Sequence, residues 1–384
     1  MDAVLVDALP RLLDAGDGDG LPRRVGYQPS LDAPSDDPHP SFVERKQVDW
    51  SRVRKLLALS EKANHWTNFG PVTAALERFL GRLLGLPEER CVVMCSSATT
   101  ALHAVIGLHE LKLGRKLRVV GCAYGFFSSN IGPLADIVLV DSDTEGMLSL
   151  EALAALDPDS YDAVLVTNLF GLRADLSDYR AFCRARGKTL IVDGATAIAG
   201  VDRSAPDGDD EVISFHHTKP WGVGEGGCAI IAREDADIVR GFLNFGVNLP
   251  RSAARCATNG KISDYASALI IDRLERMPVW SFYYRAQQHR LSRLGASRGL
   301  ALLSGNNPDA IVAHVALLAP APVAAEPLLE QPVVLRKYYR PLGDGDCPVA
   351  QRLYAHIVNV PAHSGMQVLS DEAALALIDA ACAG

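Results

Sequence analysis

No stretch of the 384-residue sequence approaches the ~18 consecutive apolar residues that a membrane-spanning helix needs. No long segment carries a dominant positive charge either, since 38 Lys and Arg residues face 46 Asp and Glu residues, for a formal net charge of −8. This balance argues against a surface for nucleic acid or for an anionic membrane. We therefore expect a protein that acts on small molecules, with no nucleic-acid or membrane partner.

The sequence also lacks paired cysteines, and its first residues do not match the pattern of a signal peptide. Its eight cysteines are scattered, mostly inside apolar runs, and form no CxxC pair, which is typical of buried thiols rather than of a metal site or a disulfide framework. The chain begins with Met-Asp, an acid where a secretory signal has a basic stretch, so a cytoplasmic location is expected.

Seven short apolar runs alternate with helical stretches and predict the strands of one sheet. They are residues 91–94, 117–120, 137–140, 163–166, 189–192, 212–215 and 228–231. Continuously apolar strands separated by helices indicate an α/β fold with a mainly parallel sheet that is covered on both faces. The last two runs are only twelve residues apart, too close for a helical crossover, so one strand there is predicted to be antiparallel.

Composition and periodicity divide the sequence into three parts. Residues 1–50 are predicted to form a short amphipathic helix and an extended lead-in, because residues 17–41 are rich in Pro, Gly and Asp. Residues 51–255 carry the strand and helix alternation and are predicted to be a large α/β domain. Residues 256–384 are predicted to be a smaller α+β domain.

The most informative stretch is SFHHTKPWGVGEGGCAII, residues 214–231. Its glycines fit GxGxxG, but a dinucleotide fingerprint needs a helix after the glycines, and here a strand follows. His216 and His217 are adjacent and would point to opposite sides, so a shared metal ion is not favoured. Lys219 remains, on a loop whose glycines allow the backbone to approach a ligand closely.

Asp193 follows the run 189–192, at the carboxyl end of a predicted parallel strand, where ligands bind in such sheets. An acid there could pair with a protonated pyridine nitrogen. It could equally cap a helix.

The segment CSSATTAL lies between a predicted strand and a helix. Such a helix start can bind phosphate, with added hydrogen bonds from Ser97 or Thr99, although both could simply cap the helix. In AYGFFSS, Tyr124 or Phe126 could stack on a flat heterocycle or belong to the core.

From about Trp66 to Pro278 the assembled pattern resembles the DegT-type (DegT/StrS) sugar aminotransferases, which depend on pyridoxal 5'-phosphate. SFHHTKPWGVGEGG is similar to the family's Ser-Phe-x-x-x-Lys segment with its trailing glycines. Other similar segments are SSATTAL, AYGFFSS, VDGATA, LNFGVN and NGKISDYASALIIDRLE. The resemblance implies the type I aminotransferase fold and a homodimer with shared active sites.

The resemblance also implies roles for single residues. Lys219 would form a Schiff base with the cofactor and shuttle the proton of the reaction, Asp193 would hold the pyridine nitrogen, and Phe126 would stack on the ring. The phosphate would be bound by a set of residues comprising Ser97, the backbone at Ala98, Thr99, Ser214, and Asn244 from the neighbouring subunit.

The sequence departs from the family pattern at several positions. Thr196 stands where the family usually has a glutamine near the cofactor's phenolic oxygen, and it could still donate a hydrogen bond with a shorter reach. Ala98 replaces a glycine of the phosphate turn, and Gly121 stands where a proline is common. These changes bear on substrate and fine chemistry more than on cofactor binding.

The implied activity is transfer of an amino group from glutamate or glutamine to a keto sugar, often nucleotide-linked, or to a keto cyclitol. Two alternatives remain open. The change at Thr196 is compatible with another reaction of the same cofactor, such as elimination or epimerisation, and a non-catalytic cofactor-binding regulator would be a different class of protein. Loops at residues 66–68, His217, Trp221 and residues 336–340 are expected to shape the pocket.

Overall fold

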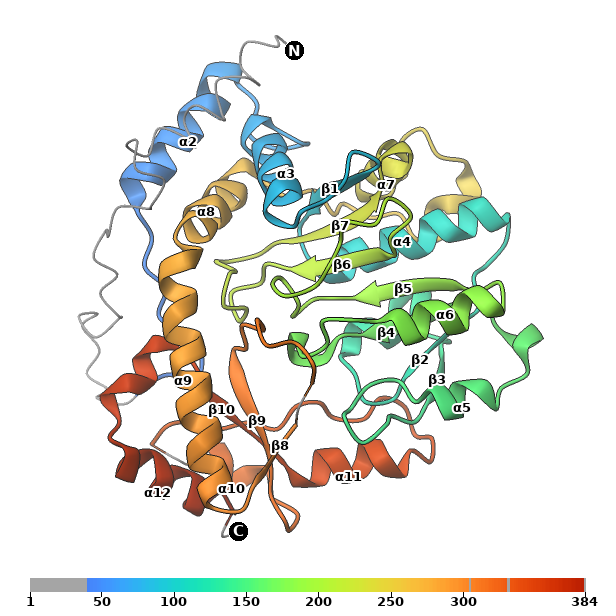
Figure 1. The fold of residues 1–384 in the computed structure, drawn as a ribbon. Coiled ribbons are helices and arrows are strands. Elements are labelled where there is room, and N and C mark those ends of the chain that lie inside the picture. The colour runs from blue at the N-terminus through green and yellow to red at the C-terminus, as the bar shows by residue number, and fades with distance from the viewer. Residues whose placement is uncertain (1–39, 304, 330–331, 383–384) are drawn as a thin grey trace.

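The computed structural model describes residues 40–303, 305–329 and 332–382. The predicted amphipathic helix and nearly all of the lead-in therefore lie outside the described residues. The described chain contains a seven-stranded sheet, a three-stranded sheet and the helices that cover them (Figure 1). None of its helices is long and apolar enough to cross a membrane.

All seven predicted apolar runs are strands of the large sheet. The strands are β1 (Arg90–Cys95), β2 (Val119–Cys122), β3 (Val138–Val140), β4 (Ala163–Thr167), β5 (Thr189–Asp193), β6 (Asp210–Ser214) and β7 (Gly227–Ala232). Their order across the sheet is β1-β7-β6-β5-β4-β2-β3. Strand β7 is antiparallel to both neighbours, and the other pairs are parallel. The predicted mainly parallel α/β sheet with one reversed strand is confirmed.

The helices up to the end of the large sheet are α2 (Trp50–Ala63), α3 (Pro71–Leu83), α4 (Ala98–Leu113), α5 (Leu150–Ala154), α6 (Ser177–Ala185) and α7 (Ala236–Leu243). Helix α4 is apolar on nearly every side and packs against β6, β7 and α7, so it is a core helix rather than a surface one. Ser97 caps its start and Gly114, in the left-handed conformation, ends it.

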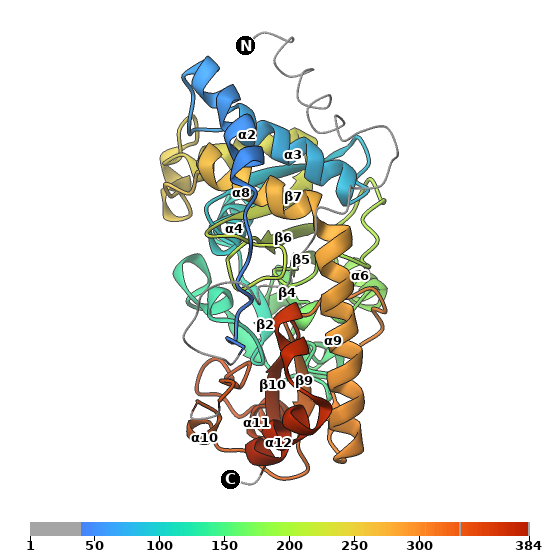
Figure 2. The same ribbon diagram turned by 90° about the vertical axis from the view of Figure 1, so that its left-hand side faces the viewer.

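The remaining helices are α8 (Asp264–Glu275), α9 (Met277–Ser297), α10 (Glu326–Leu329), α11 (Pro348–His356) and α12 (Asp371–Cys382). Strands β8 (Ala301–Leu302), β9 (His314–Leu318) and β10 (Ile357–Pro361) form the antiparallel small sheet in the order β10-β9-β8. Helix α8 packs against α2 and α3, and α9 runs on to the small sheet (Figure 2). The division of the chain at residue 255 stays a prediction.

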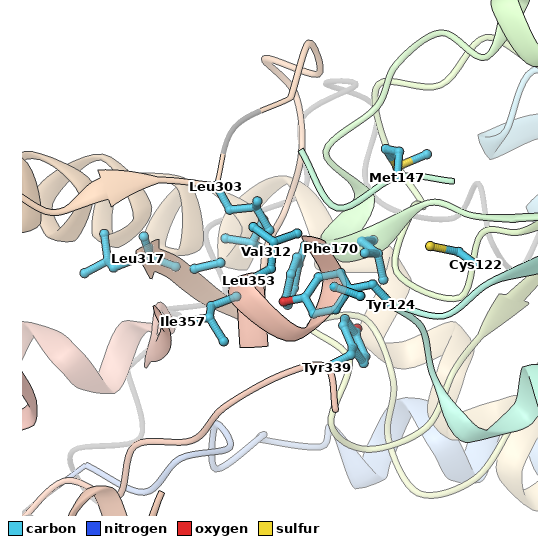
Figure 3. Packing of buried hydrophobic residues seen from close by; sticks show 14 of the residues in the cluster. Cys122, Tyr124, Met147, Phe170, Leu303, Val312, Leu317, Tyr339, Leu353 and Ile357 are labelled. Atoms are coloured by element: carbon cyan, nitrogen blue, oxygen red, sulfur yellow. The ribbon is translucent and has the colours of Figure 1, made fainter. Parts of the chain in front are cut away.

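Three buried clusters hold these layers together. One lies between α4, α7 and a face of the large sheet, and a second lies between the opposite face and α2, α3 and α8. The third joins β2 and β4 to the small sheet, and Figure 3 shows Tyr124, Phe170 and Tyr339 side by side within it. This third cluster packs strand β9 of the small sheet against residues of β2 and β4 of the large sheet.

Candidate active site

The predicted site residues converge on the carboxyl edge of the large sheet. In the parallel register Thr167, the last residue of β4, pairs with Asp193, the last residue of β5. Ser214 ends β6 and pairs with Gly227, where the antiparallel β7 begins. Because β7 runs the opposite way, its start lies at this same edge, where ligands bind in open α/β sheets.

Lys219 lies on the loop between β6 and β7, which closes on itself through backbone hydrogen bonds. The Lys219 N–H donates to the His216 carbonyl at 2.8 Å, and the Gly222 N–H donates to the Lys219 carbonyl at 3.0 Å. A Cβ at Gly222 would lie 2.1 Å from the His216 carbonyl oxygen, so only glycine permits this turn. Burial lowers the pKa of the Lys219 amine, and the charge of Asp193 opposes that shift.

Asp193 is 3% exposed, and its carboxylate accepts a hydrogen bond from the Ala195 N–H at 3.1 Å. Burial raises the pKa of this carboxyl, while the Ala195 hydrogen bond and the charge of Lys219 oppose the rise. Amine and carboxyl are therefore within electrostatic range of each other at one sheet edge. The structure brings together the two residues on which the predicted chemistry depends.

The start of α4 lies against the same edge. Ser97 forms a bridge with Gly226, its hydroxyl accepts the Thr100 N–H at 3.2 Å, and its carbonyl accepts the Ala101 N–H at 3.1 Å. These bonds leave the N–H groups of Ala98 and Thr99 at the open end of the helix.

Gly227 makes this approach of β7 to α4 possible, because a Cβ there would lie 2.2 Å from the Ala98 nitrogen. Ala98 itself is the first helical residue, a position that does not require glycine. The change from the family's glycine is therefore compatible with this turn.

The structure distinguishes the two aromatic candidates. Tyr124 is fully buried and its hydroxyl donates to the Tyr338 carbonyl at 2.7 Å, so it belongs to the core. Phe126 is 47% exposed, and its ring makes an edge contact with Tyr339 at 6.2 Å between centroids. Phe126 is thus the ring that is free to stack on a ligand.

Tyr339 lies within residues 336–340, which were expected to shape the pocket, but the sequence analysis assigned this tyrosine no role of its own. It packs against Phe126 and Phe170. Burial, and next the negative charge of Asp193, raise the pKa of its hydroxyl. That effect places the Tyr339 hydroxyl within electrostatic range of the Asp193 carboxylate.

Three other predicted residues have local partners. The Thr196 hydroxyl donates to the Asn168 carbonyl at 2.9 Å, so its only proton is already engaged. The Asn244 side-chain oxygen accepts from Lys261 Nζ at 2.7 Å. Trp221 is buried, and its indole N–H donates to the Ser214 carbonyl at 2.7 Å, so it stabilises the end of β6. The ligand roles of Thr196 and Asn244 stay predictions.

The segment before α2 contributes contacts that the sequence analysis missed. Lys46 Nζ donates to the carbonyl oxygens of His217 and Lys219, the latter at 2.6 Å. Arg273 Nε donates to the Pro220 carbonyl at 2.8 Å, and its guanidinium forms a buried ion pair with Glu44. Carbonyls of the Lys219 loop are thus held by two cations. Figure 2 shows this segment running from α2 down toward the small sheet.

Burial, together with the charge of Arg273, lowers the pKa of Lys46 to about 7 from 10.5, against the opposing charge of Glu44. A sequence pattern could have indicated these contacts. In an extended segment every second side chain points to the same side, and Phe42, Glu44 and Lys46 alternate in this way.

The residues at this edge fit pyridoxal 5'-phosphate. A buried amine and a buried acid within electrostatic range match its aldehyde and its pyridine nitrogen. The open start of α4 matches its phosphate, and an exposed phenyl ring is available to cover the heterocycle.

The fold is that of the type I pyridoxal-phosphate-dependent aminotransferases. The structure of DesI solved in the presence of its TDP-sugar product superimposes with a TM-score of 0.73 at 22% identity, covering 90% of this chain and 92% of that one.

The sequence matches the DegT/DnrJ/EryC1/StrS aminotransferase family over residues 50–374, and the chain belongs to this family. Pyridoxal 5'-phosphate is the cofactor of these aminotransferases.

The chain is also similar to curated proteins over part of its length. It is 26% identical over 228 residues to Protein Rv3402c of Mycobacterium tuberculosis, covering 56% of this chain and 54% of that protein. It is 28% identical over 174 residues to a dTDP-4-dehydro-2,3,6-trideoxy-D-glucose 4-aminotransferase of Saccharopolyspora spinosa, covering 43% of this chain and 44% of that enzyme. The matches thus span about half the length of these curated relatives.

Proposed function

We propose that this protein is a pyridoxal-phosphate-dependent aminotransferase that moves an amino group from glutamate or glutamine to a keto sugar, nucleotide-linked in its natural form, or to a keto cyclitol. The observation that carries the proposal is the Lys219 amine within electrostatic range of the buried Asp193 carboxyl at the carboxyl edge of the sheet. When bound, the cofactor supplies an electron sink for the bond changes at the substrate's nitrogen-bearing carbon.

The protein's own residues supply binding and proton handling. Burial favours the neutral, nucleophilic form of the Lys219 amine, which can accept and return a proton at Nζ. The Asp193 carboxylate would keep the pyridine nitrogen protonated and charged. The N–H groups of Ala98 and Thr99, with the hydroxyls of Ser97 and Ser214, would hold the phosphate.

The sugar class of the acceptor is supported by the names of similar proteins. The relative from Saccharopolyspora spinosa is a 4-aminotransferase of a dTDP-linked keto sugar, and DesI was solved in the presence of its TDP-sugar product.

We also propose a homodimer in which Asn244 reaches the phosphate of the neighbouring subunit. Asn244 precedes Phe245 and Val247, which are 66% and 48% exposed. Exposed apolar side chains next to this asparagine are typical of an interface.

The experiment is to load the purified protein with cofactor and follow its absorbance while glutamate or glutamine is added, and then a panel of keto sugars. We expect the band to change with the donor and to return with an acceptor. The Lys219→Ala variant should lose the resting band but keep the folded state. An absence of any donor-dependent change, with release of ammonia or water from a sugar, would favour elimination or epimerisation instead. Binding without either reaction would favour a regulator.

A further inference from the structure

His314 is the first residue of β9 and lies among three aromatic rings from distant parts of the chain. Phe42, Phe170 and Tyr338 meet its ring edge to face, with centroids 5.5, 5.4 and 5.1 Å away and interplanar angles of 82°, 85° and 85°. These rings fix the imidazole plane. None of them offers a strong hydrogen-bond partner through its ring.

Both ring nitrogens of His314 are shielded from water, and neither has a hydrogen-bond partner among the described residues. Leaving one such buried polar atom without a partner costs about 1–3 kcal/mol. Native proteins pair the great majority of these atoms, with protein, water or ligand. An imidazole with both nitrogens buried and without a hydrogen-bond partner therefore requires an explanation.

His314 also belongs to the surroundings of the reactive amine. Burial, followed by the charges of Lys219 and His363, lowers the pKa of the imidazole to about 3. The ring is consequently neutral at ordinary pH, with one nitrogen as a donor and the other as an acceptor. Two of the rings around His314, Phe170 and Tyr338, also contact Tyr339, and the Tyr339 ring contacts Phe126 at the candidate site.

We propose that His314 is a specificity residue for the amino acceptor, and that its imidazole hydrogen-bonds a hydroxyl group on the carbon beside the reacting carbonyl. A hydroxyl both donates and accepts, which complements a neutral imidazole, whereas the carboxylate of the amino donor only accepts. This inference rests on the proposed function, because it presumes a keto sugar as substrate.

The test compares two sugars that differ in this hydroxyl. dTDP-4-dehydro-6-deoxy-D-glucose carries a hydroxyl at C3, beside its carbonyl, and dTDP-4-dehydro-3,6-dideoxy-D-glucose lacks that hydroxyl alone. Dissociation constants are measured by titration calorimetry in the cofactor-containing Lys219→Ala background, where turnover is blocked. The variants are His314→Phe, which keeps a flat ring, His314→Gln, which keeps a donor and an acceptor, and His289→Phe on the exposed face of α9 as a control.

We expect His314→Phe to weaken binding of the hydroxylated sugar by about tenfold or more, the effect of one lost hydrogen bond in a buried site. Binding of the dideoxy sugar should change less than about twofold, since it has no hydroxyl at that carbon. His314→Gln should recover part of the loss, and His289→Phe should match the parent. Equal losses for both sugars, or no loss for either, would overturn the inference and leave a buried water as the partner of His314.

Half-reactions of the chain with Lys219 intact separate this inference from the proposed function. With His314→Phe, the donor half-reaction with glutamate should keep its rate, and only the acceptor half-reaction should slow. A selective loss in the donor half-reaction would assign the imidazole to the donor and overturn the inference alone. If the wild-type protein aminates no sugar of the panel, the proposed function fails and this inference fails with it.

Discussion

The Lys46 ammonium lies 2.6 Å from the backbone carbonyl oxygen of Lys219, although 173 residues separate them in the chain. The same ammonium also bonds the His217 carbonyl, and Arg273 holds the Pro220 carbonyl. The loop that carries the reactive amine is therefore positioned by side chains from outside the sheet. We expect the segment before α2 to be needed for correct placement of Lys219.

Replacing Lys46 tests this contact through its titration. Because the pKa of Lys46 is lowered to about 7 from 10.5 in the folded chain, the unfolded chain binds more protons between those values. The free energy of unfolding should then rise with pH across this window, and Lys46→Met should flatten the rise. Urea unfolding at several pH values between 7 and 10 measures the slope. Lys55→Met, on the exposed face of α2, is the control, and an unchanged slope in Lys46→Met would contradict the account.

Asp193→Asn should separate catalysis from folding. The asparagine oxygen can still accept the Ala195 N–H, so the midpoint of unfolding should change little. Loss of the negative charge next to the pyridine nitrogen should lower kcat by about 10²–10³-fold, as for the removal of other preorganised electrostatic groups. Steady-state kinetics with Asp379→Asn as a surface control provide the comparison. A kcat within about threefold of wild type would argue that Asp193 does not serve the cofactor.

Gly227→Ala should weaken cofactor binding. Its Cβ would meet the backbone of Ser97 and Ala98 at 2.2 Å, so β7 must move away from the start of α4. We expect a loss of stability of about 1–3 kcal/mol and a weaker affinity for pyridoxal phosphate, measured by fluorescence titration. Gly81→Ala meets no atom within 4 Å inside α3 and should stabilise the protein by about 0.5–1 kcal/mol. Unchanged cofactor affinity in Gly227→Ala would be incompatible with phosphate binding at this turn.

Asp264 should be a major contributor to stability without a chemical role. Its buried carboxylate accepts hydrogen bonds from the hydroxyls of Ser60 and Thr73 and from the N–H groups of Val72 and Thr73 at the start of α3. Asp264→Ala removes the acceptor of all four bonds, although the Thr73 hydroxyl keeps the Ser267 hydroxyl as a partner, and should cost at least about 3 kcal/mol in urea unfolding. The loss in Asp264→Asn should be smaller. A cost below about 1 kcal/mol in Asp264→Ala would show that water replaces the carboxylate.

The sequence predicted the parts of the fold and site that depend on local patterns. Continuous apolar runs located all seven strands, and the short spacing between β6 and β7 predicted the reversed strand. Asp193 and Lys219 follow such runs, so their positions at one sheet edge could be inferred from strand direction alone.

Other site residues are set by contacts between distant segments. His314 lies 95 positions after Lys219, and the partners of Lys46 are backbone carbonyls, which have no sequence signature. Trp221 was expected at the pocket, but it is buried and its indole N–H donates to the Ser214 carbonyl, a contact that the sequence does not reveal.

The central claim is that the Lys219 amine is the group that bonds the cofactor. Reduction of the cofactor-loaded protein with borohydride, followed by proteolysis and mass spectrometry, tests this claim directly. The account predicts a pyridoxyl phosphate adduct on Lys219. An adduct on the neighbouring Lys46 or on Lys261 instead, or no adduct in protein that binds the cofactor, would contradict it.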